Sequence, residues 1–358
     1  MITEAFLTIL DEIPIGHAGA RDFCIEFFEQ ARRNALVDLR SFENSFRGDC
    51  MLAARSTEVN VKFLDANGKA KFEAARVKEL SCQEKYSAIR FLSPSETKEI
   101  EKNQPDKILP SRYVETWKDE AKEVAKSRWV IVGFKDKEAA TIERSSPAIS
   151  VISMMVALQI SAGAGWELVV ADIETAFLQG RPLQRDSGKL YARAPKEGWP
   201  GQRGPVIAEL IKAVYGLCDG PLQFFRSLVE IFLELGLRQS VLDPCLFYHR
   251  GADGELTGLI GTEVDDLIMA GTTAFETKVL KPLRTRLVFG KWVSARTPEG
   301  VKFCGRRLRQ KEDYAFDVDQ ATYAAGLRVP KMEGADVRMW TPSLRPRKSA
   351  STVQGLVR

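Results

Sequence analysis

Two adjacent aspartates, Asp265 and Asp266, lie between two apolar runs, "GLIG" and "LIMAG". Short apolar runs of this kind predict buried β-strands, so the two carboxylates fall where one strand ends and the next begins. An ionised carboxylate is costly to bury without a partner. The pair therefore predicts either a solvated turn or a site that binds something positive.

The residues before this pair have the pattern of a β-hairpin. "CLFYHR" (Cys245 to Arg250) and "LTGLIGTEV" (Leu256 to Val264) resemble strands, and "GADGE" between them is rich in turn formers. "LIMAG" predicts a further short strand, which places the two aspartates at a hairpin tip. Because successive side chains face opposite sides of a sheet, a tip supplies only part of an ion site. A further acid from elsewhere in the chain is expected to complete it.

That further acid is predicted in "WELVVADIETAFLQG" (Trp166 to Gly180), an apolar strand that reaches Asp172 at its end and turns into a short helix carrying Phe177. If this strand lies beside the aspartate hairpin in one sheet, the three aspartates converge. An all-oxygen cluster suits Mg²⁺ or Mn²⁺, and two ions about 4 Å apart can bind the attacking and leaving oxygens of a phosphoryl transfer.

The composition excludes several other classes of protein. The longest uncharged stretch, Ser146 to Trp166, contains serines and a glutamine, so it predicts a buried core helix rather than a membrane span. Six scattered cysteines without a C-x-x-C pair predict a reduced, intracellular protein, cytoplasmic or nuclear, without disulfides or zinc. With His17 and His249 the only histidines among 358 residues, histidine-based catalysis is not expected.

Basic residues gather in one part of the chain. Lys281 to Lys311 contains ten Lys or Arg and a single acid, Glu299, which predicts a phosphate-binding surface or, alternatively, a solvated basic face. The tail from Ser343 to Arg358 has the composition of a disordered segment.

Several ordered blocks together resemble one known family. They are "SRYVETWKDEAKEVAKSRWVIVGFKD", "ADIETAFLQG", "VYGLCDGPLQFF", "LELGLRQSVLDPCLFY", "EVDDLIMAG" and "KFCGRRL". In this order and spacing, between roughly Ala75 and Leu327, they resemble the reverse transcriptase domain of copia-type retrotransposon polyproteins.

The resemblance implies an α+β fold of the right-hand polymerase type, with fingers and a palm whose antiparallel sheet is backed by helices. It implies an RNA-directed DNA polymerase that uses two Mg²⁺ or Mn²⁺ ions to join a dNTP to a primer 3′-hydroxyl. Its partners would be an RNA or DNA template with primer and a dNTP, with no membrane. RNase H and integrase blocks are not found beyond Leu327, so these domains would come from partners or further sequence.

We expect the chain to divide into four segments. The resemblance does not reach residues 1–74, where "EFFEQARRNALVDLRSF" predicts an N-terminal helical segment of unknown role. On the resemblance, residues 75–275 form the fingers and palm. Residues 276–335 form a basic primer-grip and connection region, and residues 336–358 form the tail.

The resemblance also assigns roles to individual residues. Asp172, Asp265 and Asp266 match the catalytic, metal-binding aspartates. The nucleotide-binding positions are Lys126 and Arg128, toward the triphosphate, and Phe177, which excludes a ribose 2′-hydroxyl. The primer- and template-binding positions are Phe303, Cys304, Gly305, Arg306 and Arg307. The alternatives are a core role for Phe177, solvated surface for Lys126 and Arg128, and a plain strand end for Phe303 to Gly305.

Two positions depart from the family pattern. Glu263 stands where the family usually has Tyr, and Asp219 stands where it usually has Gln. Acids near a site that accepts a polyanion are unfavourable unless metals or neighbouring Lys and Arg offset them. A decayed or domesticated remnant that binds nucleic acid without catalysis is therefore the main alternative. A four-stranded RNA-binding module is a second alternative, but its aromatic signature is absent.

Overall fold

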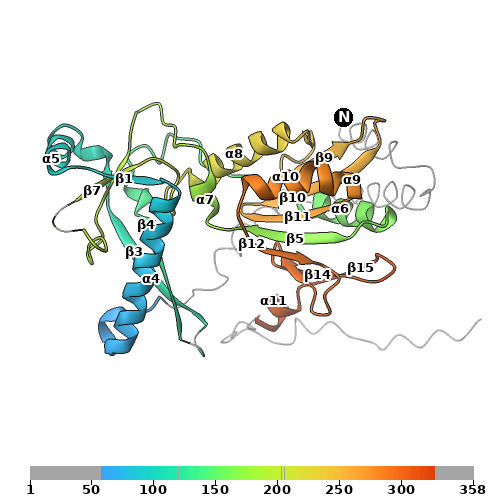
Figure 1. Ribbon diagram of the computed structural model, residues 1–358, viewed down its shortest axis with the longest axis horizontal. Coiled ribbons are helices and arrows are strands. Elements are labelled where there is room, and N and C mark those ends of the chain that lie inside the picture. The colour runs from blue at the N-terminus through green and yellow to red at the C-terminus, as the bar shows by residue number, and fades with distance from the viewer. Residues whose placement is uncertain (1–57, 120, 122, 203, 205, 327–358) are drawn as a thin grey trace, which may run out of the picture. The chain divides into compact units, whose positions relative to one another are not determined.

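The computed structural model describes residues 58–119, 121, 123–202, 204 and 206–326. Within them the chain is a mixture of helices and of four β-sheets, as the sequence predicts (Figure 1). The described residues up to Asp319 form one compact unit, and of the second unit Gln320 and the helix α11 (Ala321–Gly326) are described. The predicted tail and most of the predicted N-terminal helical segment lie outside the described residues.

The largest sheet is antiparallel and has six strands in the order β12-β5-β11-β10-β9-β8. The hairpins predicted around the aspartate pair are confirmed, because consecutive strands β9, β10 and β11 pair in register. The strands are β5 (Leu168–Ile173), β8 (Arg238–Gln239), β9 (Leu246–Arg250), β10 (Leu256–Glu263), β11 (Asp266–Gly271) and β12 (Phe289–Ser294).

Alternating apolar residues let this sheet bury both of its faces. One face packs its even-numbered β5 and β11 residues, such as Leu168 and Ile268, against α6 (Val151–Gly163). The other face packs Ala171 and Leu267 against α8 (Gly220–Glu234) and α10 (Lys281–Arg286) (Figure 1).

The uncharged stretch predicted to be a core helix is α6. Its start is capped by Ser150, whose hydroxyl accepts a hydrogen bond from the Ser153 amide, and most of its apolar side chains are buried. Within the described residues, no helix has both the length and the apolar character needed to cross a bilayer.

A second group of elements surrounds a separate apolar cluster that includes Trp129, Tyr113 and Leu80. It consists of α4 (Ala66–Lys85), the hairpin β3 (Ser111–Asp119) and β4 (Val124–Ile131), and a four-stranded sheet in the order β1-β7-β6-β2. Those four strands are β1 (Ile89–Phe91), β2 (Ile108–Leu109), β6 (Tyr191–Arg193) and β7 (Ile207–Leu210).

A three-stranded sheet packs on the α6 side of the large sheet through Val301, Phe303 and Leu308. Its strands are β13 (Val301–Phe303), β14 (Arg306–Gln310) and β15 (Phe316–Asp319). The remaining short elements are α5 (Pro94–Asn103), α7 (Ala176–Gln179), α9 (Thr273–Phe275), a π-helix (Glu276–Leu280) and 3₁₀ turns at Val61–Phe63, Pro105–Lys107 and Gly133–Lys135.

Candidate active site

The three aspartates predicted to converge come together at one end of two adjacent strands. β5 and β11 are antiparallel neighbours, and their register places Asp266 directly opposite Asp172. Asp265 lies in the turn between β10 and β11, where its backbone oxygen accepts a hydrogen bond from the Ile173 amide at 2.8 Å. The turn is tight, since Val264 has a φ of 55°. The register confirms that Asp172 and Asp266 are neighbours, whereas the sharing of an ion by the three carboxylates and their catalytic role stay predictions.

Negative charge accumulates at this end of the sheet. Burial raises the pKa of Asp265, and the charge of Asp172 raises it further. Burial, together with Asp265, Asp172 and Glu263, raises the pKa of Asp266 to about 6. One oxygen of Asp172, Oδ1, is buried without a hydrogen-bond partner. The cluster therefore holds more negative charge than the surrounding protein offsets.

This donor set fits a hard divalent cation. Carboxylate oxygens are the ligands that Mg²⁺ and Mn²⁺ prefer, and a cation would relieve both the unpartnered oxygen and the mutual repulsion. Among the described residues, no group of three or more His, Cys, Asp and Glu side chains is already arranged to hold an ion. Since Mg²⁺ is commonly bound by one or two carboxylates together with substrate phosphates, a closed cage of protein ligands is not required.

The basic residues Lys126 and Arg128 lie two positions apart on β4 and so share a face of that strand. Burial lowers the pKa of Lys126, and the charge of Asp172 acts in the opposite direction. The charge of Arg128 likewise opposes the rise in the pKa of Asp265. Both cations are therefore within electrostatic range of the aspartates, although the chain separates them by more than 40 residues.

Phe177 lies in α7, directly after the strand that carries Asp172. Its half-buried ring meets Tyr215 edge-on, with centroids 5.1 Å apart, and Phe224 at 6.2 Å. Burial, followed by Glu79 and then Asp265, raises the pKa of Tyr215, so this tyrosine lies within electrostatic range of the aspartate hairpin. Tyr215 is a site neighbour that the sequence reading missed, although it stands in the quoted block "VYGLCDGPLQFF". The packing holds the Phe177 ring rigidly and is compatible with both the predicted gate and the core role.

The predicted primer-binding residues form the hairpin between β13 and β14. Cys304 and Gly305 have φ angles of 47° and 69°, as a two-residue type I′ turn requires. Burial, followed by Glu263, raises the pKa of the Cys304 thiol, which places the turn beside the tip of the aspartate hairpin. The Phe303 ring is buried in the apolar cluster on the α6 side of the large sheet, and this packing anchors the hairpin.

Arginines in the same hairpin differ in their partners. Arg306 donates to the Cys304 backbone oxygen at 3.1 Å, whereas Arg307 forms an ion pair with Asp319 at 2.7 Å across β14 and β15. Other basic residues of the stretch from Lys281 to Lys311 also pair with acids outside it, namely Arg284, Arg286, Arg309 and Lys311. The stretch is therefore less positive in the folded chain than its sequence suggests.

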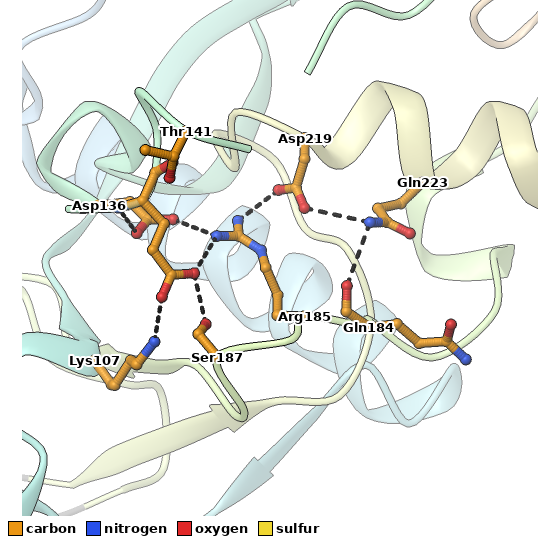
Figure 2. A network of polar contacts seen from close by, with 9 residues as sticks. Lys107, Asp136, Thr141, Gln184, Arg185, Ser187, Asp219 and Gln223 are labelled. Carbon is orange, nitrogen blue, oxygen red and sulfur yellow. Dashed lines mark hydrogen bonds and ion pairs between the residues drawn. The ribbon is translucent and has the colours of Figure 1, made fainter. Parts of the chain in front are cut away.

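Asp219, one of the two departures from the family pattern, belongs to a separate ionic network. Arg185 donates to Asp219 at 2.6 Å and to Asp136 at 2.7 Å, and Figure 2 shows its guanidinium between the two carboxylates. All three side chains are less than 5% exposed. Arg185 is therefore the kind of basic neighbour that the sequence analysis required if Asp219 was to be tolerated.

The network extends to the loop from Asp136 to Thr141 and to α8 (Figure 2). Glu138 accepts hydrogen bonds from Lys107 and Ser187, and the Gln223 side chain donates to Asp219 at 3.4 Å. Hydrogen bonds from Lys107, followed by Ser187, lower the pKa of Glu138. Asp219 was noticed in the sequence only as a departure from the family pattern, and its pairing with Arg185 gave no sequence signal because the two are 34 positions apart.

Comparison with known proteins identifies relatives of this chain. A family model described as "Reverse transcriptase (RNA-dependent DNA polymerase)" matches residues 97–323. Over 147 residues the chain is 25% identical to the retrovirus-related Pol polyprotein from transposon TNT 1-94 of Nicotiana tabacum. It is 27% and 29% identical to those from transposons RE2 and RE1 of Arabidopsis thaliana. Each match covers 41% of this chain and only 10 or 11% of the relative.

Proposed function

Because the chain belongs to the reverse transcriptase (RNA-dependent DNA polymerase) family, with a domain of the copia type, we propose that it extends primers by RNA-directed DNA synthesis. The observation that carries the proposal is the pairing of Asp266 with Asp172 across β11 and β5, with Asp265 in the adjoining turn. Burial, followed by the neighbouring acids, raises the pKa values of Asp265 and Asp266.

In this proposal Asp172, Asp265 and Asp266 hold divalent ions, either Mg²⁺ or Mn²⁺. Bound there, the ions supply the Lewis acidity that lowers the pKa of a primer 3′-hydroxyl and offset charge on the leaving pyrophosphate. Lys126 and Arg128 bind the triphosphate of the incoming nucleotide. The ring of Phe177 lies beside its sugar, where it leaves no room for a 2′-hydroxyl.

The elements around the site then take the parts of a right-hand polymerase. The six-stranded sheet with α6, α8 and α10 would be the palm. The hairpin β3–β4, α4 and the four-stranded sheet would be the fingers. The turn at Cys304 and Gly305, with Arg306 beside it, would contact the primer. These contacts would be to phosphates and would carry no sequence information.

The relatives are named as Pol polyproteins, and the chain spans about a tenth of their length. We therefore propose that RNase H and integrase functions, if they act with this domain, are supplied by other polypeptide segments. The proposed activity concerns primer extension alone.

One observation favours a second function, the binding of nucleic acid without polymerisation. Glu263 pairs with Asp266 across the hairpin and raises the pKa of both neighbouring aspartates, so it adds negative charge where a nucleotide would bind. The compensation of Asp219 by Arg185 removes the other reason for this alternative.

Primer extension on an RNA template, with Mg²⁺ or Mn²⁺, separates the two functions. Wild-type protein should extend the primer, and Asp172→Asn should reduce the rate by roughly a thousandfold, because metal binding at the site contributes several kcal/mol to catalysis. Asp313→Asn, at an exposed turn, is the matched control and should extend normally. Wild-type protein that binds primer and template but does not extend would establish the binding function instead.

A further inference from the structure

The edge strand β12 contains an irregularity beside Asp172. In its register with β5, Phe289 pairs with Ile173 and Lys291 pairs with Asp172. Ile173 and Asp172 are consecutive residues, whereas one extra residue separates Phe289 from Lys291. The extra residue is Gly290, which makes this a β-bulge. The bulge also explains why Phe289 and Trp292, three positions apart, pack on the same apolar cluster with ring centroids 4.9 Å apart.

Gly290 lies directly against the Asp172 carboxylate. A Cβ at this position would lie 3.0 Å from Oδ2 and 3.4 Å from Oδ1 of Asp172. The backbone of Gly290 is outside the left-handed region, so other residues could adopt its conformation. Glycine is therefore needed here for the space that it leaves rather than for its φ angle.

The Asp172 carboxylate depends on this space for its position. Its Oδ1 atom has no hydrogen-bond partner, so no donor anchors that oxygen. A methyl group at position 290 would displace the carboxylate by a few tenths of an ångström, toward Asp265 and Asp266 or away from them.

We propose that Gly290 is a positioning residue, which sets the Asp172 carboxylate at the distance that Mg²⁺ coordination needs. The inference rests on the proposed function, in which Asp172 is a metal ligand. Mg²⁺ requires near-ideal octahedral geometry with oxygens at about 2.0–2.1 Å, whereas Ca²⁺ accepts irregular geometry at about 2.3–2.6 Å. A displaced Asp172 carboxylate should therefore weaken Mg²⁺ binding more than Ca²⁺ binding.

A metal-binding measurement on Gly290→Ala tests this difference without relying on activity. Mn²⁺ bound to the full chain is measured by electron paramagnetic resonance, and Mg²⁺ and Ca²⁺ are measured by competition. The variant should weaken Mg²⁺ binding about tenfold and Ca²⁺ binding by threefold or less. Gly326→Ala, where a Cβ would meet nothing within 4 Å, is the matched control and should change neither.

Thermal unfolding separates positioning from a general packing defect. A glycine-to-alanine change at a compatible backbone position is neutral or stabilising. If Gly290→Ala lowers Tm, the loss should disappear when Asp172→Ala is also present, because the clash is with that carboxylate. A loss of Tm that persists in the double variant would overturn the inference.

Asp172→Asn distinguishes failure of the inference from failure of the proposed function. If Asp172→Asn loses Mn²⁺ binding while Gly290→Ala keeps the wild-type Mg²⁺ to Ca²⁺ ratio, the positioning role of Gly290 is wrong and the proposed function stands. If Asp172→Asn binds Mn²⁺ as tightly as wild-type protein does, both are wrong.

Discussion

Two clusters of carboxylates in the described chain differ in how their charge is compensated. Around Arg185, the carboxylates of Asp136 and Asp219 meet a guanidinium at 2.7 and 2.6 Å. At the ends of β5 and β11, the described residues form no ion pair with Asp172, Asp265 or Asp266, and the pKa values of the last two are raised. In the first region each carboxylate contacts a cation of the chain, whereas in the second the described residues supply no such contact, as the proposed metal site requires.

This difference teaches which acids are structural. A carboxylate with a buried cationic partner stabilises the fold only as a member of the pair. Removal of either partner leaves the other charge buried without compensation and lowers the stability of the fold. A carboxylate that is left beside others of its kind opposes folding, and such strain is common where a site binds ligands. The predictions below test this contrast.

Removal of Arg185 should have the largest effect, because it would make the first region resemble the second. Arg185→Met leaves Asp136 and Asp219 buried without a cation, and should lower the free energy of unfolding by about 3–5 kcal/mol. Urea unfolding measures the change. Arg193→Met, which breaks a half-exposed pair with Glu101, should lower it by less than about 1 kcal/mol. Equal effects of the two variants would end the distinction between the regions.

Phe177 follows the strand that carries Asp172, and its ring packs on Tyr215, four residues before Asp219. If the ring borders the nucleotide sugar, Phe177→Ala should reduce discrimination against ribonucleotides by about tenfold, because steric exclusion of one hydroxyl is lost. The ratio of kcat/KM for the two nucleotides measures the effect. Phe316→Ala, a partly buried aromatic on the other face of the sheet, should leave that ratio unchanged. Unchanged discrimination with reduced activity in Phe177→Ala would assign the ring to the core.

The compensated region should also respond to pH in a definite direction. The pKa of Glu138 is lowered by Lys107 and then by Ser187, so its ionised form stabilises the fold above the ordinary value of 4.5. That contribution is lost as the pH falls through the lowered pKa of the folded state. Glu138→Gln should therefore lower the free energy of unfolding by about 0.5–1 kcal/mol at pH 7.

The difference between Glu138→Gln and wild type should narrow as the pH falls below 4.5, as measured by urea unfolding across that range. Glu99→Gln, on an exposed position of α5, should show no such narrowing. A difference that grows on acidification would contradict the sign of the shift.

Substitution of Arg306 or Arg307 should have the smallest effect, which is on the salt dependence of nucleic-acid binding. The comparison separates an arginine that already pairs with an acid from one that is available to bind phosphate. Binding to primer and template should weaken with salt, and Arg306→Ala should flatten the logarithmic slope by up to about one unit. Arg307→Ala should flatten it less, because Asp319 already offsets that charge. Equal slopes in wild type and Arg306→Ala would place Arg306 on a solvated face.

Much of the architecture followed from local patterns. Apolar runs with turn residues between them predicted β9, β10 and β11, and the uncharged run from Ser146 predicted the core helix α6. The position of Asp172 at the end of an apolar strand predicted its place beside the aspartate hairpin. These features were readable because strand and helix periodicities depend on neighbours in the sequence.

Only the tertiary structure decided how the charges are compensated and where space is left. Asp219 looked like an added acid at the site until Arg185, 34 residues away, proved to be its partner. The run of cations from Lys281 to Lys311 looked unpaired until acids such as Asp317 and Glu234 met several of them. Gly290 gave no signal before the bulge placed it against Asp172. Ion pairs and close contacts of this kind follow no sequence period, because they depend on which distant segments the folded core brings together.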